Sequence, residues 1–257
     1  MSFVVICCVA CAASALTFFS GFGLGTLLLP AFAWFVPVEQ AVALTAVVHL
    51  LNGVFKMLLV GRHADRGVLL RFGLPAVAAA VVGAWLLHVL GASAPLVRGE
   101  VLGRTIEVTP VKLVVGVLLL VFALLEVTPR LRDLSFPPAA MPLGGLASGF
   151  LGGLSGMQGA LRAAFLARAG LSKEAFVATS AAIACLVDLS RLAVYTASLR
   201  AAWRPGDAGL LAAAVAAAFG GAVLGSRLLP KLTLVAVQRV VAALLAAVAI
   251  GMMTGLL

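Results

Sequence analysis

An arginine follows a glycine-rich interruption in an otherwise apolar part of the chain. Residues 152–162 read GGLSGMQGALR, with four glycines before the arginine at position 162. Glycine adopts backbone conformations that other residues avoid, and a helix that begins after such a break presents free N–H groups and a partial positive charge. Anions bind readily at such a helix N-terminus, and a guanidinium group donates two parallel hydrogen bonds to an oxyanion. The segment therefore predicts an anion site in which Arg162 is the cation.

A second interruption of the same kind, SGFGLG, lies near the beginning of the chain. It ends an apolar run over residues 3–19 and precedes a short helix that we expect over residues 26–36. Two half-helix N-termini that meet within the membrane would together form an anion receptor. The substrate-binding residues predicted from the two breaks and from the long helix between them are Gly23, Gly25, Thr26, His49, Asn52, Ser155, Gly156, Gln158, Gly159 and Arg162.

Polar residues also occur inside the longer apolar runs. His49 and Asn52 are three residues apart and so share one face of a helix. Imidazole gains and loses a proton near neutral pH, so His49 is either a proton carrier or a hydrogen-bonded core residue. Lys56 extends the same face near the basic end of its helix, where we expect its side chain to reach the headgroups.

Asp188 and Arg191 lie three residues apart in another predicted helix. Side chains at this spacing are neighbours on a helix surface, so we expect a structural or gating ion pair. An alternative is that Arg162 pairs with Asp188 and only braces the fold.

The composition is that of a membrane protein. Of the 257 residues, 63% are hydrophobic and 11% are charged, whereas soluble domains are about half apolar and about a quarter charged. Apolar runs recur at about 20 residues, the length of a helix that crosses a hydrocarbon core of ~30 Å, and none alternates with a period of two. The sequence therefore predicts an all-α polytopic membrane protein whose surroundings are the lipid bilayer.

Charge and cysteine content exclude other classes. The net charge of +9 comes from Lys and Arg residues scattered at the ends of apolar runs, which does not indicate a nucleic-acid partner. The four cysteines are Cys7, Cys8, Cys11 and Cys185, all within apolar runs, so neither a disulfide framework nor a metal or other cofactor is expected.

The pattern of apolar runs restarts after a proline-rich linker at residues 129–139. We therefore divide the chain into a first transmembrane repeat, residues 1–128, and a second one, residues 140–257. A shift of 134 residues places Gly25 on Gly159 and Thr45 on Thr179. Repeats with paired interrupted segments are typical of secondary transporters, whose site lies where the repeats meet. A duplicated scaffold without a transport role is the alternative.

The distribution of Lys and Arg favours one topology. Each break is either a kinked crossing or the tip of a re-entrant hairpin. The re-entrant arrangement gathers nine basic residues on one side of the membrane and leaves four on the other, as the positive-inside rule favours. The nine are Arg62, Arg66, Arg71, Arg130, Arg132, Arg168, Lys173, Arg227 and Lys231; the four are Arg98, Arg104, Arg200 and Arg204. Each repeat then has a hairpin and three full transmembrane helices, so the two repeats are inverted and both termini lie outside the cytoplasm.

Two segments also resemble a known family. GFGLGTLLLP followed by VEQAVALTAVVHLLN, and GLSGMQGALRAAFLARAGLSKEAFVAT in the second half, are similar to the sulfite exporter TauE/SafE family of TSUP-type membrane transporters. The resemblance covers nearly the whole chain apart from the connection around Pro95. It implies export or uptake of sulfite, sulfoacetate or related sulfonates. Gln158 occupies a region where the family commonly has a third glycine, which implies a subgroup with a different anion.

These observations predict a secondary transporter of a small sulfur-containing anion, such as sulfite or an organosulfonate, that works by alternating access in a bacterial plasma (inner) membrane. An enzyme is not expected, because no general acid and nucleophile are clustered. The alternatives are an anion channel, a membrane-embedded enzyme with a re-entrant helix site, and a thiol relay through Cys8 and Cys11. An inside-negative potential opposes anion uptake, so uptake requires a co-transported cation, for which a proton on His49 is the candidate. A homodimer is left open.

Overall fold

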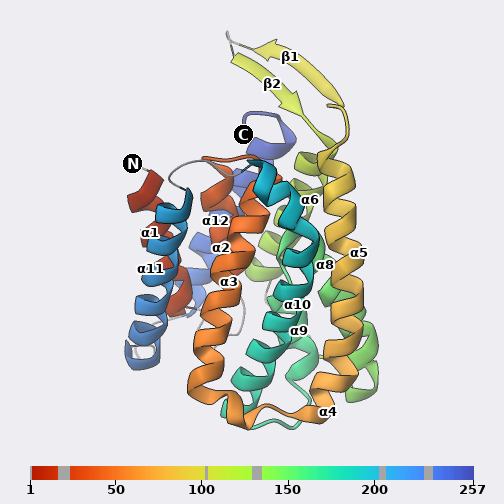
Figure 1. The fold of residues 1–257 in the computed structure, drawn as a ribbon, viewed down its shortest axis with the longest axis vertical. Coiled ribbons are helices and arrows are strands. Elements are labelled where there is room, and N and C mark those ends of the chain that lie inside the picture. Colours follow the sequence, from red (N-terminus) through yellow and green to blue (C-terminus); the bar gives the residue numbers. More distant parts are fainter. Residues whose placement is uncertain (1, 17–23, 102–103, 129–134, 203–206, 229–233) are drawn as a thin grey trace.

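The computed structural model is a bundle of helices that run roughly along one axis (Figure 1). It describes residues 2–16, 24–101, 104–128, 135–202, 207–228 and 234–257. Within these residues, four helical segments are long and apolar enough to cross a membrane: Val38–His63, Arg66–Gly91, Lys173–Thr196 and Ala208–Gly225. The all-α class predicted from composition is confirmed.

The elements before the linker begin with a helical hairpin. They are α1 (Ser2–Leu16), α2 (Leu24–Ala33), α3 (Val38–Val60), α4 (Arg66–Val68), α5 (Leu74–Gly91), β1 (Val97–Val101), β2 (Arg104–Val108) and α6 (Pro110–Val127). The short helix expected over residues 26–36 is thus α2. The connection around Pro95 holds an antiparallel β-hairpin in which Arg98 pairs with Glu107, an element that the sequence analysis did not predict.

The helices after the linker begin in the same order: a helix, a short helix and then a long helix. They are α8 (Met141–Ser155), α9 (Gly159–Leu166), α10 (Lys173–Ala202), α11 (Asp207–Leu228) and α12 (Leu234–Met253). Short 3-10 turns at Gly61–His63 and Pro138–Ala140 follow α3 and precede α8.

Helices α8 and α9 form a hairpin. Gly156 ends α8 with φ +80°, a left-handed conformation that favours glycine. The segment that leads into α8 lies next to the end of α9: the Phe136 N–H donates to the Ala164 carbonyl at 3.3 Å. The Phe136 and Phe165 rings also stack, with centroids 4.2 Å apart. The chain therefore enters and leaves this hairpin at the same end of the bundle.

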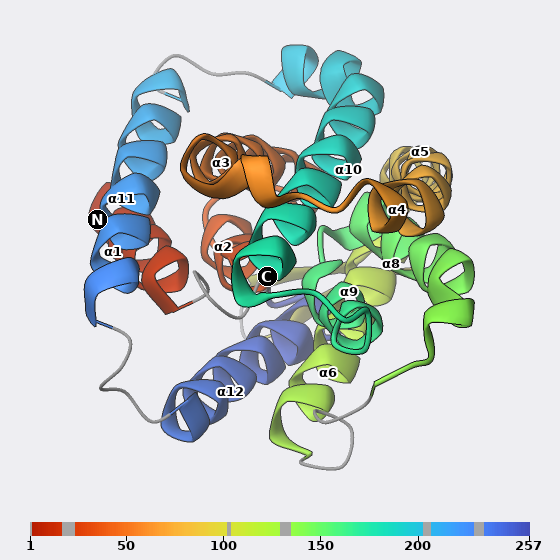
Figure 2. The same ribbon diagram turned by 90° about the horizontal axis from the view of Figure 1, so that it is seen from below.

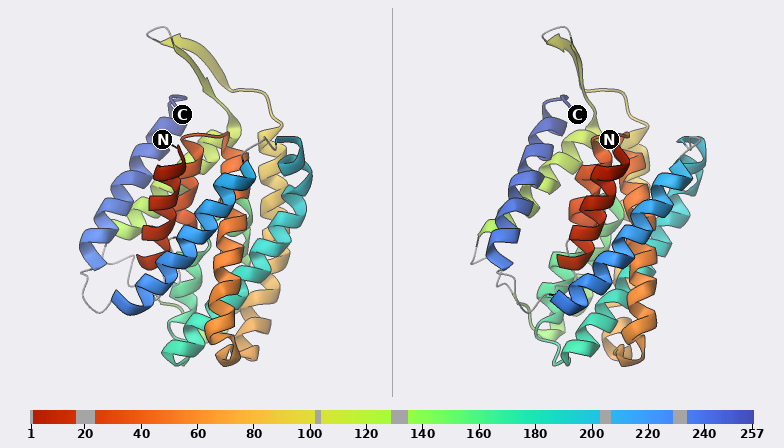
Figure 3. Two further views of the ribbon diagram at one scale, coloured as in Figure 1. Left: turned by 60° about the vertical axis from the view of Figure 1, so that its left-hand side comes forward. Right: turned by 90° about the vertical axis from the view of Figure 1, so that its left-hand side faces the viewer.

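The two ends of the bundle differ. Both chain termini and the β-hairpin lie at one end, and α4 lies at the other (Figures 1 and 3). The end with α4 also holds the turn after α3 and the start of α10, since the Asp65 N–H donates to Thr179 Oγ1 at 2.9 Å. Arg62, Arg66 and Lys173 thus lie at the α4 end, whereas Arg98 lies on the β-hairpin.

Helices from before and after the linker pack against each other in pairs. Seen from below, α3 and α10 lie in the middle, with α1 and α11 on one side and α5 and α8 on the other (Figure 2). Helices α5 and α8 meet backbone to backbone: a Cβ added to Gly149 or Gly153 would overlap the carbonyl oxygen of Ala76 or Ala80. In the same way, a Cβ at Gly221 of α11 would overlap the Cys11 carbonyl of α1. Small residues allow this close approach of membrane helices.

Candidate anion-binding site

A small pocket lies between α3, α9 and α10. Its lining residues are His49, Asn52, Gly53, Lys56, Arg162, Val177, Ser180, Ala181 and Ala184. The volume is about 30 Å³, which is room for roughly one or two water molecules. An anion of several heavy atoms therefore requires the three helices to separate slightly or the side chains to turn.

The polar wall of the pocket carries two buried cations. Lys56 is 9% exposed and Arg162 is 1% exposed, and a cation within the bilayer costs at least ~2.5–3.5 kcal/mol. Among the described residues, the buried charged side chains are the cations Lys56, Arg162 and Arg191 and one carboxylate, Asp188. The site therefore has an excess of positive charge, which a bound anion would offset.

Helix α9 holds Arg162 in the pocket wall. The residue lies one turn into the helix, where its N–H donates to the Gln158 carbonyl at 3.1 Å. Its Nε donates to Ser180 Oγ of α10 at 2.8 Å. This bond fixes one side of the guanidinium group and orients the remaining donors.

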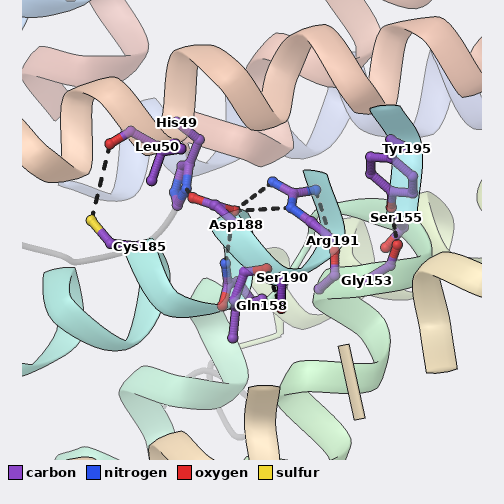
Figure 4. Close-up of polar contacts among 12 residues, drawn as sticks. His49, Leu50, Gly153, Ser155, Gln158, Cys185, Asp188, Ser190, Arg191 and Tyr195 are labelled. Atoms are coloured by element: carbon purple, nitrogen blue, oxygen red, sulfur yellow. Dashed lines mark hydrogen bonds and ion pairs between the residues drawn. The ribbon is translucent and has the colours of Figure 1, made fainter. Parts of the chain in front are cut away.

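A buried network adjoins the pocket and is centred on Asp188 (Figure 4). His49 Nδ1 of α3 lies 2.5 Å from Asp188 Oδ2 of α10. Asp188 Oδ1 accepts from Arg191 Nε at 2.9 Å and from Gln158 Nε2 at 3.3 Å. Arg191 and Asp188 thus form an ion pair, with Nη2 at 2.7 Å from Oδ1. The attraction between the two charges offsets part of the cost of removing both of them from water.

The network continues to the second break. Arg191 Nη1 donates to the Gly152 carbonyl at 3.3 Å, and the Tyr195 hydroxyl donates to the Gly153 carbonyl. Both carbonyls belong to the last turn of α8, and the Gly152 carbonyl also accepts from the Gly156 N–H at 2.9 Å. His49 in the pocket wall is therefore connected through Asp188 and Arg191 to the backbone beside the break.

The two breaks approach each other closely. A Cβ added to Gly25 at the start of α2 would lie 2.9 Å from the Gly156 carbonyl oxygen and 4.0 Å from His49 Cδ2. Gly156, Met157 and Gln158 are buried there. The start of α2 therefore packs on the second break, and the pocket lies beside this contact, about one turn further along α9.

The structure brings together only part of the predicted site. His49, Asn52 and Arg162 line the pocket. The predicted residues that lie around the breaks and do not line it are Gly25, Thr26, Ser155, Gly156, Gln158 and Gly159. Ser155 Oγ instead donates to the Leu151 carbonyl within α8, at 2.9 Å. Gly23 lies outside the described residues.

The expectation for Lys56 was wrong. Its side chain does not reach the bundle surface but lines the pocket, because α3 continues to Val60 and leaves Lys56 a full turn inside the helix. Ser180 is a site residue that the sequence analysis missed. The signal was its place on the face of α10 that also carries Val177 and Ala184.

A model of the family described as sulfite exporter TauE/SafE matches residues 6–252. No curated protein and no solved structure matches the chain. The match covers both glycine breaks, the pocket and the Asp188 network. The chain therefore belongs to the sulfite exporter TauE/SafE family of multi-pass membrane transporters.

Proposed function

We propose that this protein is a secondary transporter of a small sulfur-containing anion, sulfite or an organosulfonate, and that the pocket between α3, α9 and α10 is its cargo site. The observation that carries the proposal is the pair of buried cations, Lys56 and Arg162, in one pocket wall. Asn52 and Ser180 add neutral hydrogen-bonding groups. Such a wall matches the several oxygens of a sulfur oxyanion.

Alternating access between two inverted repeats is the mechanism that we propose. Its support is the reciprocal packing of the halves: the first hairpin helix of each half packs on a long helix of the other, α8 on α5 and α1 on α11. Helix α3 runs toward the α4 end and α10 runs away from it (Figure 1). Transporters built in this way hold their cargo where the repeats meet.

We propose that the conformation shown is the one that binds the cargo anion from the cytoplasm. The pocket uses the part of α3 that approaches Val60 and the part of α10 that begins at Lys173, so it lies toward the basic α4 end. The positive-inside rule assigns that end to the cytoplasm of a bacterial inner membrane. The Asp188 network and the packed breaks lie on the other side of the pocket and close it from there.

An anion screen tests the cargo class. Purified protein is heated with sulfite, sulfate, thiosulfate, sulfoacetate, taurine and phosphate, each at the same ionic strength. We expect at least one sulfur anion to raise the melting temperature in a saturable way, because a ligand that binds only the folded state stabilises it. If all the anions, with chloride as the reference, shift the melting temperature equally, the pocket does not select a sulfur anion and the proposal is wrong.

Lys56→Met is expected to weaken binding of the selected anion by about tenfold, since a charged hydrogen-bond donor contributes roughly 1.5–3 kcal/mol and Arg162 partly compensates. The measurement is a titration that follows the melting temperature or intrinsic fluorescence. Lys173→Met is the matched control, because Lys173 is exposed at the start of α10. Equal effects of the two substitutions would show that only net charge matters and that Lys56 does not bind the cargo.

A further inference from the structure

We propose that His49 binds a proton together with the cargo anion, so that each transport cycle moves one proton and one anion in the same direction. The proposal rests on the proposed function, since it needs an anion in the pocket. Its basis is that one imidazole belongs both to the pocket wall and to the buried Asp188 network.

The contact with Asp188 determines where the proton binds. Asp188 is buried against Arg191 at 2.7 Å, which favours the ionised carboxylate. An ionised carboxylate only accepts hydrogen bonds, so the His49 Nδ1 at 2.5 Å must carry a hydrogen. In the neutral ring Nε2 is then the acceptor, and it makes no hydrogen bond to any described residue. Nε2 is therefore the atom that takes up the additional proton.

The charges around His49 make proton binding depend on the cargo. The titratable and charged side chains near it on α3, α9 and α10 are Lys56, Arg162, Cys185, Asp188 and Arg191. In an empty pocket the Asp188 carboxylate favours a positive charge on the ring, and the two cations of the wall oppose it. A bound oxyanion offsets those cations and accepts a hydrogen bond from the protonated Nε2. Anion and proton therefore favour each other.

The other helices that pack on α3 do not change the balance of charges around His49. Helix α2 and residues 208–225 of α11 contain no titratable side chain. The described titratable side chains of α5 and α6 are His88 and Lys112, and both lie toward the β-hairpin. Lys112 Nζ donates to the Glu107 carbonyl of β2 at 2.9 Å. Arg62 and His63 lie in the turn after α3, where the His63 ring is exposed.

Coupling between two ligands is reciprocal, so the affinity for the anion must rise as the pH falls. Where His49 is neutral in the empty protein and protonated in the loaded one, the affinity rises up to about tenfold per pH unit. A co-transported proton makes the movement of a monoanion electroneutral and halves the charge moved with a dianion. The opposing potential costs about 2.3 kcal/mol per charge per 100 mV, so this coupling allows uptake as well as export.

The test is calorimetric titration of the whole protein with sulfate, thiosulfate and sulfoacetate between about pH 6 and about pH 8, the range in which imidazole titrates. These probes stay ionised over that range, whereas sulfite itself titrates. Each titration is repeated in two buffers that differ in ionisation heat, which counts the protons taken up. We expect tighter binding at the lower pH and uptake of up to one proton per bound anion.

Two variants test whether His49 is the group that takes up the proton. His49→Gln keeps an amide donor near Asp188 but has no titratable nitrogen, so binding is expected to become independent of pH with no proton uptake. His63→Gln is the control, because the exposed His63 lies in the turn after α3, and it is expected to keep the pH dependence of the wild type. If His49→Gln does not fold, proton uptake by the wild type still decides whether a proton binds with the anion.

The outcomes separate the two proposals. Anion binding without proton uptake, at an affinity that does not change with pH, overturns the proton site and leaves the anion transporter intact. A pH dependence that persists in His49→Gln also overturns it, because another group then takes up the proton. If none of the three probes binds at any pH, and neither sulfite nor taurine raises the melting temperature in the anion screen, the anion pocket itself is wrong.

Discussion

Arg162→Met is expected to weaken binding of the cargo anion by about 100-fold, which corresponds to about 2.7 kcal/mol. The residue is 1% exposed, lies in the pocket wall and is oriented by Ser180. A charged hydrogen-bond donor contributes roughly 1.5–3 kcal/mol, and the upper part of this range applies because the bidentate geometry of guanidinium is lost as well. Methionine keeps most of the length of the side chain, so the substitution leaves little empty space.

The anion-free Arg162→Met protein is expected to melt at the same temperature as the wild type or higher. Its pocket then holds one buried cation instead of two, and removal of the desolvation cost of Arg162 offsets the loss of its hydrogen bond to Ser180. Residues that bind ligands at the expense of stability behave in this way. If Arg162 only braced the fold, the substitution would instead lower the melting temperature and leave the anion response unchanged.

Arg168→Met is the matched control for this experiment. Arg168 follows the same short helix α9 but is exposed, so its loss changes the net charge by the same amount without touching the pocket. We expect its anion affinity to stay within about twofold of the wild type, since exposed charges interact weakly. If the anion affinity of Arg168→Met fell as much as that of Arg162→Met, long-range attraction of the anion, and not contact with the guanidinium group, would cause both effects.

Gly153→Ala is expected to destabilise the protein by roughly 3 kcal/mol or more, in the upper range for overpacked interiors. A Cβ at this position would overlap the Ala80 carbonyl of α5 and lie 2.8 Å from the Ala84 nitrogen. These are backbone atoms, so α5 and α8 have to move apart. In an unrestricted helix the same substitution stabilises by about 1 kcal/mol, so packing reverses the sign. Thermal unfolding in detergent and the yield of folded protein measure the effect.

Gly220→Ala provides the comparison within the same protein. Gly220 lies in α11, and no atom of a described residue is within 4 Å of a Cβ added there. We expect this variant to melt at or slightly above the temperature of the wild type. Equal behaviour of Gly153→Ala and Gly220→Ala would mean that α5 and α8 are not in backbone contact in the folded protein.

The sequence predicted the local elements well where their boundaries are chemically marked. The long helix expected between the two breaks is α3, and its ends are marked by Pro37 before it and Gly61 after it. The break after α8 was recognised from its glycines, and Gly156 has the left-handed conformation that requires one. The β-hairpin was missed because its two strands are short and contain charged residues, a pattern that resembles a polar loop.

The position of the pocket was beyond sequence reasoning. The two breaks were predicted to converge, and Gly25 does lie against Gly156. Their close backbone contact leaves the space for a ligand one turn away, beside Lys56 and Ser180. Which face of α3 meets which face of α10 depends on packing between distant segments, and no local pattern encodes it. The spacing of Asp188 and Arg191 predicted their ion pair because both lie on one helix.

The exchange of helices between the halves has a mechanical consequence. The backbones of α8 and α5 are in direct contact, and so are those of α1 and α11. Neither helix pair can slide along its contact unless a backbone carbonyl of one helix first moves away from the other helix. Each of these helices therefore has to move together with its partner from the other half. In the alternating-access cycle proposed above, each moving unit would then contain helices from both sides of the linker. If the chain were cut at the linker, the two fragments would have to associate before either could fold.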